Sequence, residues 1–419
     1  MYKKTILNNG LRIITVPQKE SKTATVLVLV GTGSKYETKE ISGISHFLEH
    51  MFFKGTKRFK KPKDVAEFLD KIGGDFNAFT GEEYTGYYAK VSAEHLDIAF
   101  EWVSDIFLNS IIPLKEVEKE RGVIIEEINM YKNNPMMYIG QLWKEVLYGD
   151  QPAGWDIAGT KETVSSITRK NILNYISSQY NAKNTIVCLA GNINEEEAIQ
   201  KTKKYFNKTK IKKSKEKVKV IERQKEPQAL FFYKDTEQTN LALGVRSYNM
   251  THKDKYVCDL LAIILGGMMS SRLFEEIREK LGVAYYVKTY NEADTDTGSI
   301  VTFVGVDNLK LEKVIKTILK EYKKLTEKRV NEKELKKAKD YMKGKMILNL
   351  ESSHSKAYFY ATQELLKKEI LTIEDIFDKI DKVTGEDILR VAKDIFKNKN
   401  LNLALIGPNK KQYNNLLKL

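Results

Sequence analysis

Along the first thirty residues hydrophobic and polar positions alternate, and from about residue 43 the spacing changes to that of helices. Alternation with turn residues such as Asn8-Asn9-Gly10 predicts strands, and proline at the start with glycine just past the end predicts the helix after Pro62. The predicted strands are 5–7, 11–16, 23–30, 75–80, 84–91 and 185–191, and the predicted helices are 43–55, 62–72, 93–109 and 114–133.

The second half of the chain repeats the pattern of the first. Asn184 and Gly191 match Asn400 and Gly407, and both pairs are 216 residues apart (400 − 184 and 407 − 191). A period near half the chain length indicates two similar domains, and strands followed by helices without strict alternation favour an α+β fold. The predicted parts are a first domain at 1–205, a lysine-rich linker at 206–224 and a second domain at 225–419.

The helix predicted at 43–55 is apolar nearly all round and should be buried, yet it contains two histidines and a glutamate. His46 and His50 are four residues apart, so both side chains leave one face of the helix, and Glu49 stands beside that face. Imidazole suits zinc, and H-x-x-E-H is the inverted form of the H-E-x-x-H zinc-protease motif. The alternative is a pair of core histidines bonded to backbone carbonyls. The spacing of four residues, with a carboxylate between the histidines, favours the metal site.

A catalytic zinc needs a third protein ligand, and the helix after Pro113 is rich in carboxylates. At 100° per residue, Glu120 and Glu127 fall with Glu116 in an arc of about 40°, whereas Glu126 points to the polar side. A carboxylate on a core-facing stripe needs a partner more than one in water does. Glu127 is therefore the predicted ligand, and Glu120 could orient a histidine. The alternative is an ordinary solvated helix face.

Composition excludes several classes of protein. With 42% hydrophobic and 30% charged residues in 419, the chain is typical of soluble globular proteins. No apolar run approaches the roughly 18 residues of a membrane helix, and the N-terminus lacks the apolar region of a secretory signal, so we expect no membrane and a cytoplasmic location. The net charge of +14 comes from scattered lysines without a nucleic-acid motif, so no nucleic-acid partner is predicted.

Together these residues resemble the pitrilysin and mitochondrial processing peptidase family of inverted zinc proteases. The resemblance covers nearly the whole chain, with matching stretches at 43–56, 73–80, 120–127, 271–274 and 278–285. It implies two homologous domains, each a mainly antiparallel sheet packed with helices. It also implies one zinc ion per chain held by His46, His50 and Glu127, with Glu49 as general base and Glu120 as accessory glutamate.

The resemblance further implies how a substrate is held. Asn77-Ala78-Phe79 matches the edge strand to which family substrates add as a β-strand, and Arg278 and Tyr285 match a pair that holds the substrate backbone. Short family members work as pairs of chains. Because this chain carries both the zinc motif and the Arg278–Tyr285 pair, a homodimer is predicted, and a heterodimer stays open.

The predicted function is a zinc endopeptidase that cleaves peptides or unfolded segments in a chamber between its domains. One alternative is a non-catalytic partner or scaffold subunit, which would have no use for the intact motif. Another is a basic binding protein with a structural metal. A closed structural site needs a fourth ligand, and the remaining histidines, His95, His252 and His354, are scattered along the chain.

Overall fold

The computed structural model describes residues 2–409 and 413–419, which form two compact units. Each unit is discontinuous in sequence. The first contains the chain up to Asn129, Asp156–Val218 and Ile347–Ile370, and the second contains Met130–Trp155, Lys219–Met346 and the chain from Leu371. The expected domain boundaries at residues 205 and 225 stay a prediction.

A six-stranded sheet organises the first unit, in the order β1-β2-β6-β3-β5-β4. Its strands are β1 (Lys3–Ile6), β2 (Arg12–Pro17), β3 (Thr23–Val30), β4 (Asp75–Thr80), β5 (Thr85–Ser92) and β6 (Thr185–Gly191). Only β2 and β6 pair in parallel. Seven of the eight residues of the central strand β3 are buried, and six of these are apolar, because both faces of the sheet are covered.

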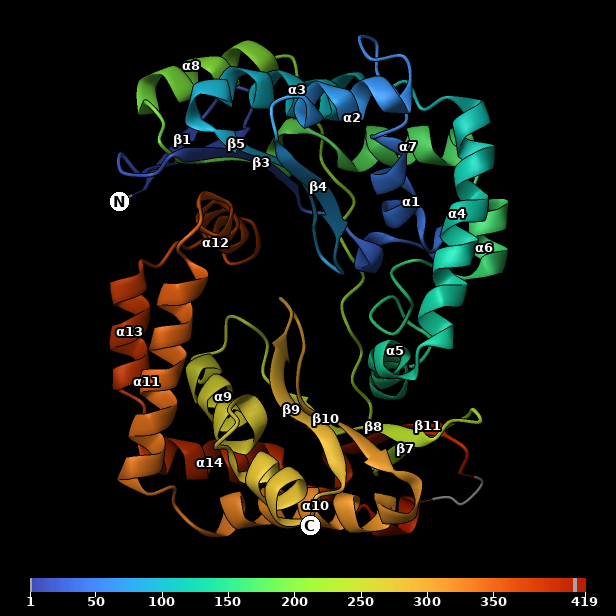
Figure 1. Ribbon diagram of the computed structural model, residues 1–419, viewed down its shortest axis with the longest axis vertical. Coiled ribbons are helices and arrows are strands. Elements are labelled where there is room, and N and C mark those ends of the chain that lie inside the picture. The colour runs from blue at the N-terminus through green and yellow to red at the C-terminus, as the bar shows by residue number, and fades with distance from the viewer. Residues whose placement is uncertain (1, 410–412) are drawn as a thin grey trace. The chain divides into compact units, whose positions relative to one another are not determined.

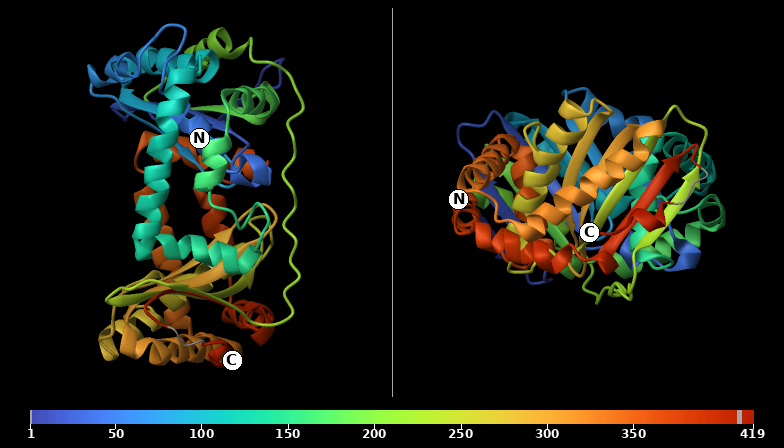
Figure 2. Two further views of the ribbon diagram at one scale, coloured as in Figure 1. Left: turned by 90° about the vertical axis from the view of Figure 1, so that its right-hand side faces the viewer. Right: turned by 90° about the horizontal axis from the view of Figure 1, so that it is seen from below.

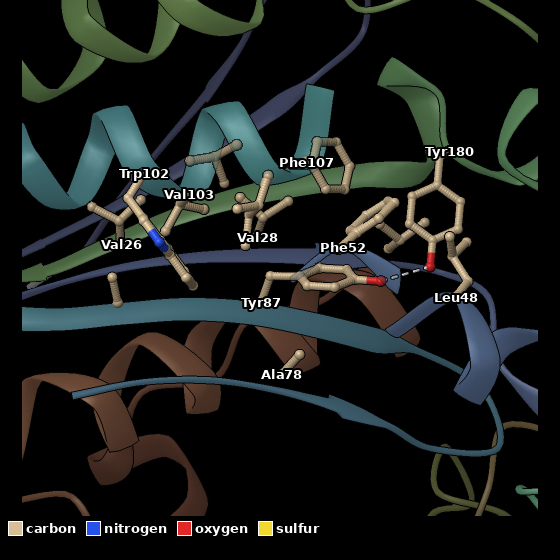
Figure 3. Packing of buried hydrophobic residues seen from close by; sticks show 14 of the residues in the cluster. Val26, Val28, Leu48, Phe52, Ala78, Tyr87, Trp102, Val103, Phe107 and Tyr180 are labelled. Carbon is tan, nitrogen blue, oxygen red and sulfur yellow. Dashed lines mark hydrogen bonds between the residues drawn. The ribbon is translucent and has the colours of Figure 1, made fainter. Parts of the chain in front are cut away.

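Helices cover both faces of this sheet. They are α1 (Ile44–Met51), α2 (Pro62–Asp70), α3 (Leu96–Asn109), α4 (Leu114–Asn133), α6 (Lys161–Ser166), α7 (Arg169–Gln179), α8 (Glu195–Phe206) and α12 (Ser353–Leu366). On one face, Trp102 and Phe107 of α3 pack with Val28, Phe52 and Tyr87 (Figure 3). The helix predicted to reach residue 55 ends at Met51.

The other face is covered by α12, which comes from the second half of the sequence (Figure 1). Ala357 and Ala361 pack against the strands, and Ser353 Oγ lies 2.9 Å from Thr25 Oγ1. In the second unit the corresponding place is taken by α5 (Pro135–Tyr148), from the first half, whose Trp143 packs on the strands there. The two helices begin 353 − 135 = 218 residues apart, close to the repeat of 216, so they are equivalent helices exchanged between the halves.

The sheet of the second unit has the order β7-β11-β8-β10-β9. Its strands are β7 (Gln228–Tyr233), β8 (Gln238–Ser247), β9 (Ala284–Ala293), β10 (Gly298–Asp307) and β11 (Leu401–Gly407), and only β7 and β11 are parallel. The other helices of this half are α9 (Lys255–Ala262), α10 (Leu311–Glu327), α11 (Glu332–Asn349), α13 (Ile373–Asp381) and α14 (Gly385–Ile395). The helices α10 and α14 lie across the sheet (Figure 2). The predicted α+β class with mainly antiparallel sheets is confirmed.

Within the predicted linker, no helix or strand is formed between residues 207 and 227. Lysines of a linker are expected to be solvated, but Lys217 is an exception. The side chain of Lys217 is 14% exposed, and its Nζ lies 2.7 Å from Oε1 of the buried Glu83. The same carboxylate oxygen lies 3.1 Å from Nζ of the buried Lys35. At least this part of the linker is therefore fixed on the first unit.

The turn before α4 has a strained backbone. Ile112 is a buried β-branched residue with a φ of 44°, in the left-handed region that such residues avoid. Arg169 stabilises the turn, because its Nε donates to the carbonyl oxygen of Ile112 at 2.6 Å and its Nη2 to that of Ile111 at 3.1 Å. Arg169 thus bonds the turn from which α4 starts.

We expect Arg169→Met to lower the free energy of unfolding by about 2–3 kcal/mol, because two carbonyls lose charged donors while the aliphatic packing is kept. Urea denaturation followed by fluorescence measures the change. The neighbouring exposed Lys170, changed to Met, is the control and should change stability by less than about 0.5 kcal/mol. Equal stability of the two variants would show that the arginine does not hold the turn.

Candidate metal centre

The helix α1 begins at a position that only glycine fills easily. Gly43 precedes the helix with a φ of 94°, and a Cβ there would lie 2.5 Å from the carbonyl oxygen of Ala158. The first N–H groups of the helix bind the buried carboxylate of Glu37, whose oxygens accept from Gly43 N at 2.7 Å and Ser45 N at 2.8 Å. Burial raises the pKa of Glu37 to about 8, against the effect of these hydrogen bonds. The helix is thereby fixed at its N-terminal end.

Three predicted ligands come together between α1 and α4. His46 Nε2 lies 3.6 Å and His50 Nε2 3.5 Å from Oε2 of Glu127, and the three ligand atoms lie within 4.8 Å of one another. Ligands about 2.0–2.1 Å from a tetrahedral zinc lie about 3.3–3.4 Å apart. Two imidazoles and one carboxylate at this spacing therefore fit a zinc ion with one position left open.

The side chains of Glu126 and Glu127 point in different directions. Glu126 is exposed and accepts a hydrogen bond from Asn129 Nδ2 at 3.3 Å, whereas Glu127 faces the histidines. The helical spacing of α4 had selected Glu127 in the same way.

Glu120 lies behind His50. Its Oε1 is 2.9 Å from His50 Nδ1, and its Oε2 is 2.8 Å from Lys54 Nζ. Burial alone would raise the pKa of Glu120, but the hydrogen bonds from His50 and Lys54 outweigh burial and lower it. An ionised Glu120 accepts the Nδ1–H of His50 and leaves the Nε2 lone pair directed at the cluster. Lys54 was not singled out from the sequence, although it follows His50 by four residues.

Glu49 lies next to the ligands without being one of them. Its Oε2 accepts a hydrogen bond from Thr80 Oγ1 at 2.5 Å. Burial raises the pKa of Glu49, and the hydrogen bond from Thr80 opposes that rise. A buried carboxylate with a raised pKa is suited to accept and return a proton. Thr80 is the last residue of the matching stretch 73–80, but no role was predicted for it, because a threonine at the end of a strand is common.

The two histidines differ in their affinity for protons. Burial, together with the neighbouring charge of His50, lowers the pKa of His46 to about 4. For His50, burial acts in the same direction but is outweighed by hydrogen bonds to Glu120 and Glu127, which raise the pKa to about 9. Without a metal, the cluster should hold one proton on His50 near neutral pH.

The predicted substrate residues lie on β4 and in the second unit. Among the described strands β4 pairs only with β5, so Asn77, Ala78 and Phe79 lie on an edge strand, with Asn77 exposed and Ala78 buried. In the second unit, Arg278 lies in the helical turn Phe274–Lys280, with its guanidinium carbon 5.7 Å from the ring centre of Tyr285 on β9. The side chain of Tyr285 is 79% exposed.

Comparison with known proteins places this fold and cluster in a family. Residues 12–161 match the family model described as insulinase (peptidase family M16), and residues 166–342 match that of the peptidase M16 inactive domain. An uncharacterized zinc protease of Bacillus subtilis, YmxG, is 36% identical over 97% of this chain and 98% of its own length. One of Rickettsia felis is 37% identical over 96% and 97%.

Solved structures agree. A protease from Helicobacter pylori is 28% identical, with a TM-score of 0.92 over 97% of this chain and 99% of its own. A peptidase M16 inactive domain from Pseudomonas fluorescens, at 16% identity, shares the fold with a TM-score of 0.89. The two α+β units and the predicted ligands are those of a peptidase-like protein. The chain belongs to peptidase family M16, the insulinase and pitrilysin family, as predicted from the sequence.

No helix in the described part of the chain is long and apolar enough to cross a membrane.

We expect Glu120→Gln to weaken zinc binding by about 10- to 100-fold, because His50 loses the charged acceptor that orients it. Competition with a chromogenic chelator measures the dissociation constant. Glu126→Gln, an exposed change on the same helix, is the matched control and should alter affinity by less than about twofold. If both variants bind equally, Glu120 does not support the ligand.

We expect zinc binding at about pH 6 to release about one proton per ion, because a metal on Nε2 displaces the proton of His50. With a pKa of about 4, His46 is already neutral there. Calorimetry in buffers of different ionisation enthalpy counts the protons, and the Glu49→Gln variant removes any contribution from that carboxyl. Release of no proton would contradict the protonated state of His50, and release of two would contradict the neutral state of His46.

Proposed function

We propose that this chain is a zinc-dependent endopeptidase that cleaves peptides or unfolded segments bound as an added β-strand. The observation that carries the proposal is the cluster of His46, His50 and Glu127 together with Glu49, whose carboxylate interacts electrostatically with His50 and Glu127. The names of the relatives as zinc proteases support it, and so does the open fourth position that three ligands leave.

Each residue would have a separate task in the cleavage. A zinc ion held by His46, His50 and Glu127, one per chain, would polarise the scissile carbonyl and make a water molecule more acidic. Glu49 accepts the proton of the attacking water and then delivers it to the amine that leaves. Glu120 orients His50 throughout and is not consumed.

Substrate binding would use the free edge of β4. A peptide added to Asn77-Ala78-Phe79 is held through its main chain, which gives affinity with loose sequence preference. Arg278 and Tyr285 carry donors for substrate carbonyl oxygens. The proposal includes an enclosed chamber between the domains, which would favour short or unfolded chains, and a homodimer, with a heterodimer as the alternative.

A non-catalytic scaffold is the second candidate. What speaks against it is the complete set of groups around the cluster, from Glu49 with its raised pKa to Glu120 bonded to His50. A structural metal site would close with a fourth protein ligand, whereas the cluster among the described residues contains three.

We expect the zinc-loaded wild type to cleave quenched peptides of about ten to thirty residues, a length that suits an enclosed chamber. Glu49→Gln should reduce kcat by about 10²- to 10⁴-fold, because the base is lost while the ligands stay. Elemental analysis must show one zinc per chain in both proteins. The exposed Glu126→Gln serves as a control and should cleave normally.

The other outcomes separate the alternatives. If wild type and variant are both silent although folded and loaded with zinc, the chain is a scaffold or lacks a partner subunit, and adding candidate subunits distinguishes these. If both cleave equally, the base is not Glu49.

A further inference from the structure

The carboxylate of Glu49 is held by a residue of the neighbouring sheet. Oε2 accepts the hydroxyl of Thr80 at 2.5 Å, and among the described residues Glu49 Oε1 accepts no hydrogen bond. We propose that Thr80 is a positioning residue, whose hydroxyl fixes one oxygen of Glu49 so that the other is free for the attacking water. This inference rests on the proposed peptidase function.

A glutamate in this place needs an external support. Its side chain has several rotatable bonds, and holding it in one conformation costs about 1–2 kcal/mol of entropy. The helix α1 fixes only the start of the side chain. A short hydrogen bond to an ionised oxygen is among the stronger interactions available to a carboxylate, and it also defines the orientation of the group. The Thr80 hydroxyl is the described group that makes such a bond.

Thr80 itself is placed rigidly. It is the last residue of β4 and pairs with Thr85 of β5, whose hydroxyl donates to the carbonyl oxygen of Thr32 at 2.9 Å. Its side chain lies on the same face of β4 as the buried Ala78, because alternate residues of a strand share a face. The hydroxyl is therefore directed to the side of the sheet on which α1 lies.

The turn after Thr80 is fastened to the segment that precedes α1. Lys35 N donates to the carbonyl oxygen of Glu82 at 2.9 Å, and Lys35 Nζ lies 3.1 Å from the buried carboxylate of Glu83. The backbone also approaches closely there, since a Cβ on Gly33 would lie 2.1 Å from the carbonyl oxygen of Gly81. The strand end cannot drift away from the helix without breaking these contacts.

The same strand would carry both the substrate and the support of the base. Asn77, Ala78 and Phe79, where we propose that the peptide binds, immediately precede Thr80. A peptide on β4 and the carboxylate of Glu49 are thus positioned by one rigid element. An error of about 1 Å in such an arrangement can reduce a rate by about 10²-fold.

The test compares Thr80→Val, which keeps the shape and removes the hydroxyl, with Thr80→Ser, which keeps the hydroxyl. We expect Thr80→Val to lower kcat by about 10- to 100-fold with KM changed by less than about threefold, while Thr80→Ser stays within about threefold of wild type. Zinc content should be one per chain in all three. A damaged substrate strand would raise KM, and a merely structural threonine would change the melting temperature without this split.

A second measurement tests the role of Thr80 without an activity assay. In crystal structures of the zinc-loaded variants, the Glu49 carboxylate should be turned away or take more than one orientation in Thr80→Val, and stay in place in Thr80→Ser. If wild type cleaves no peptide even with candidate subunits added, the proposed function fails, but this comparison still tests Thr80. An unmoved Glu49 in Thr80→Val, wild-type turnover by that variant, or an equal loss in both variants would overturn the inference.

Discussion

The candidate site depends on one constraint: two imidazoles on a largely apolar helix need partners away from bulk water. Burying them unpaired would cost several kcal/mol. His50 bonds Glu120 of α4, and His46 Nε2 faces Glu127 of α4 at 3.6 Å, although among the described residues His46 Nδ1 has no hydrogen-bond partner. The remaining supports fix where these two helices begin. Glu37 binds the first N–H groups of α1, and Arg169 holds the strained turn before α4. The positions of the three predicted ligands therefore depend on where the helices α1 and α4 start.

Much of this follows from spacing along the chain. A step of 100° per residue was enough to favour Glu127 over Glu126, because side-chain direction on a long helix depends on local geometry alone. The strands predicted at 75–80 and 84–91 correspond to β4 and β5. The end of α1 was not predicted, because Phe52 continues the apolar pattern and is buried, although the regular helix stops at Met51. An apolar residue at that position is expected whether it continues the helix or is only buried after it, so the sequence pattern does not show where the helix ends.

Contacts between distant segments could not be predicted in this way. The bond between Thr80 and Glu49 joins a strand end to a helix 31 residues away, and nothing in either segment specifies the other. The exchange of α5 and α12 is a similar case. The repeat of 216 residues indicated two equivalent halves, but an amphipathic pattern tells which face of a helix is buried and not which sheet covers it. In each unit a helix from the other half of the sequence covers the second apolar face of the sheet.

The free edge of β4 completes the same argument. Exposed edges invite unwanted pairing, and proteins usually cover them or make them polar. The strand β4 is six residues long, and its Asp75 and Asn77 are exposed. These polar side chains disfavour unspecific pairing with other strands. Such an edge can accept an added strand through its main chain. Because Thr80 at its end bonds Glu49, the edge is a rigid part of the site, and we infer that a peptide placed on it would lie in a fixed position relative to the base.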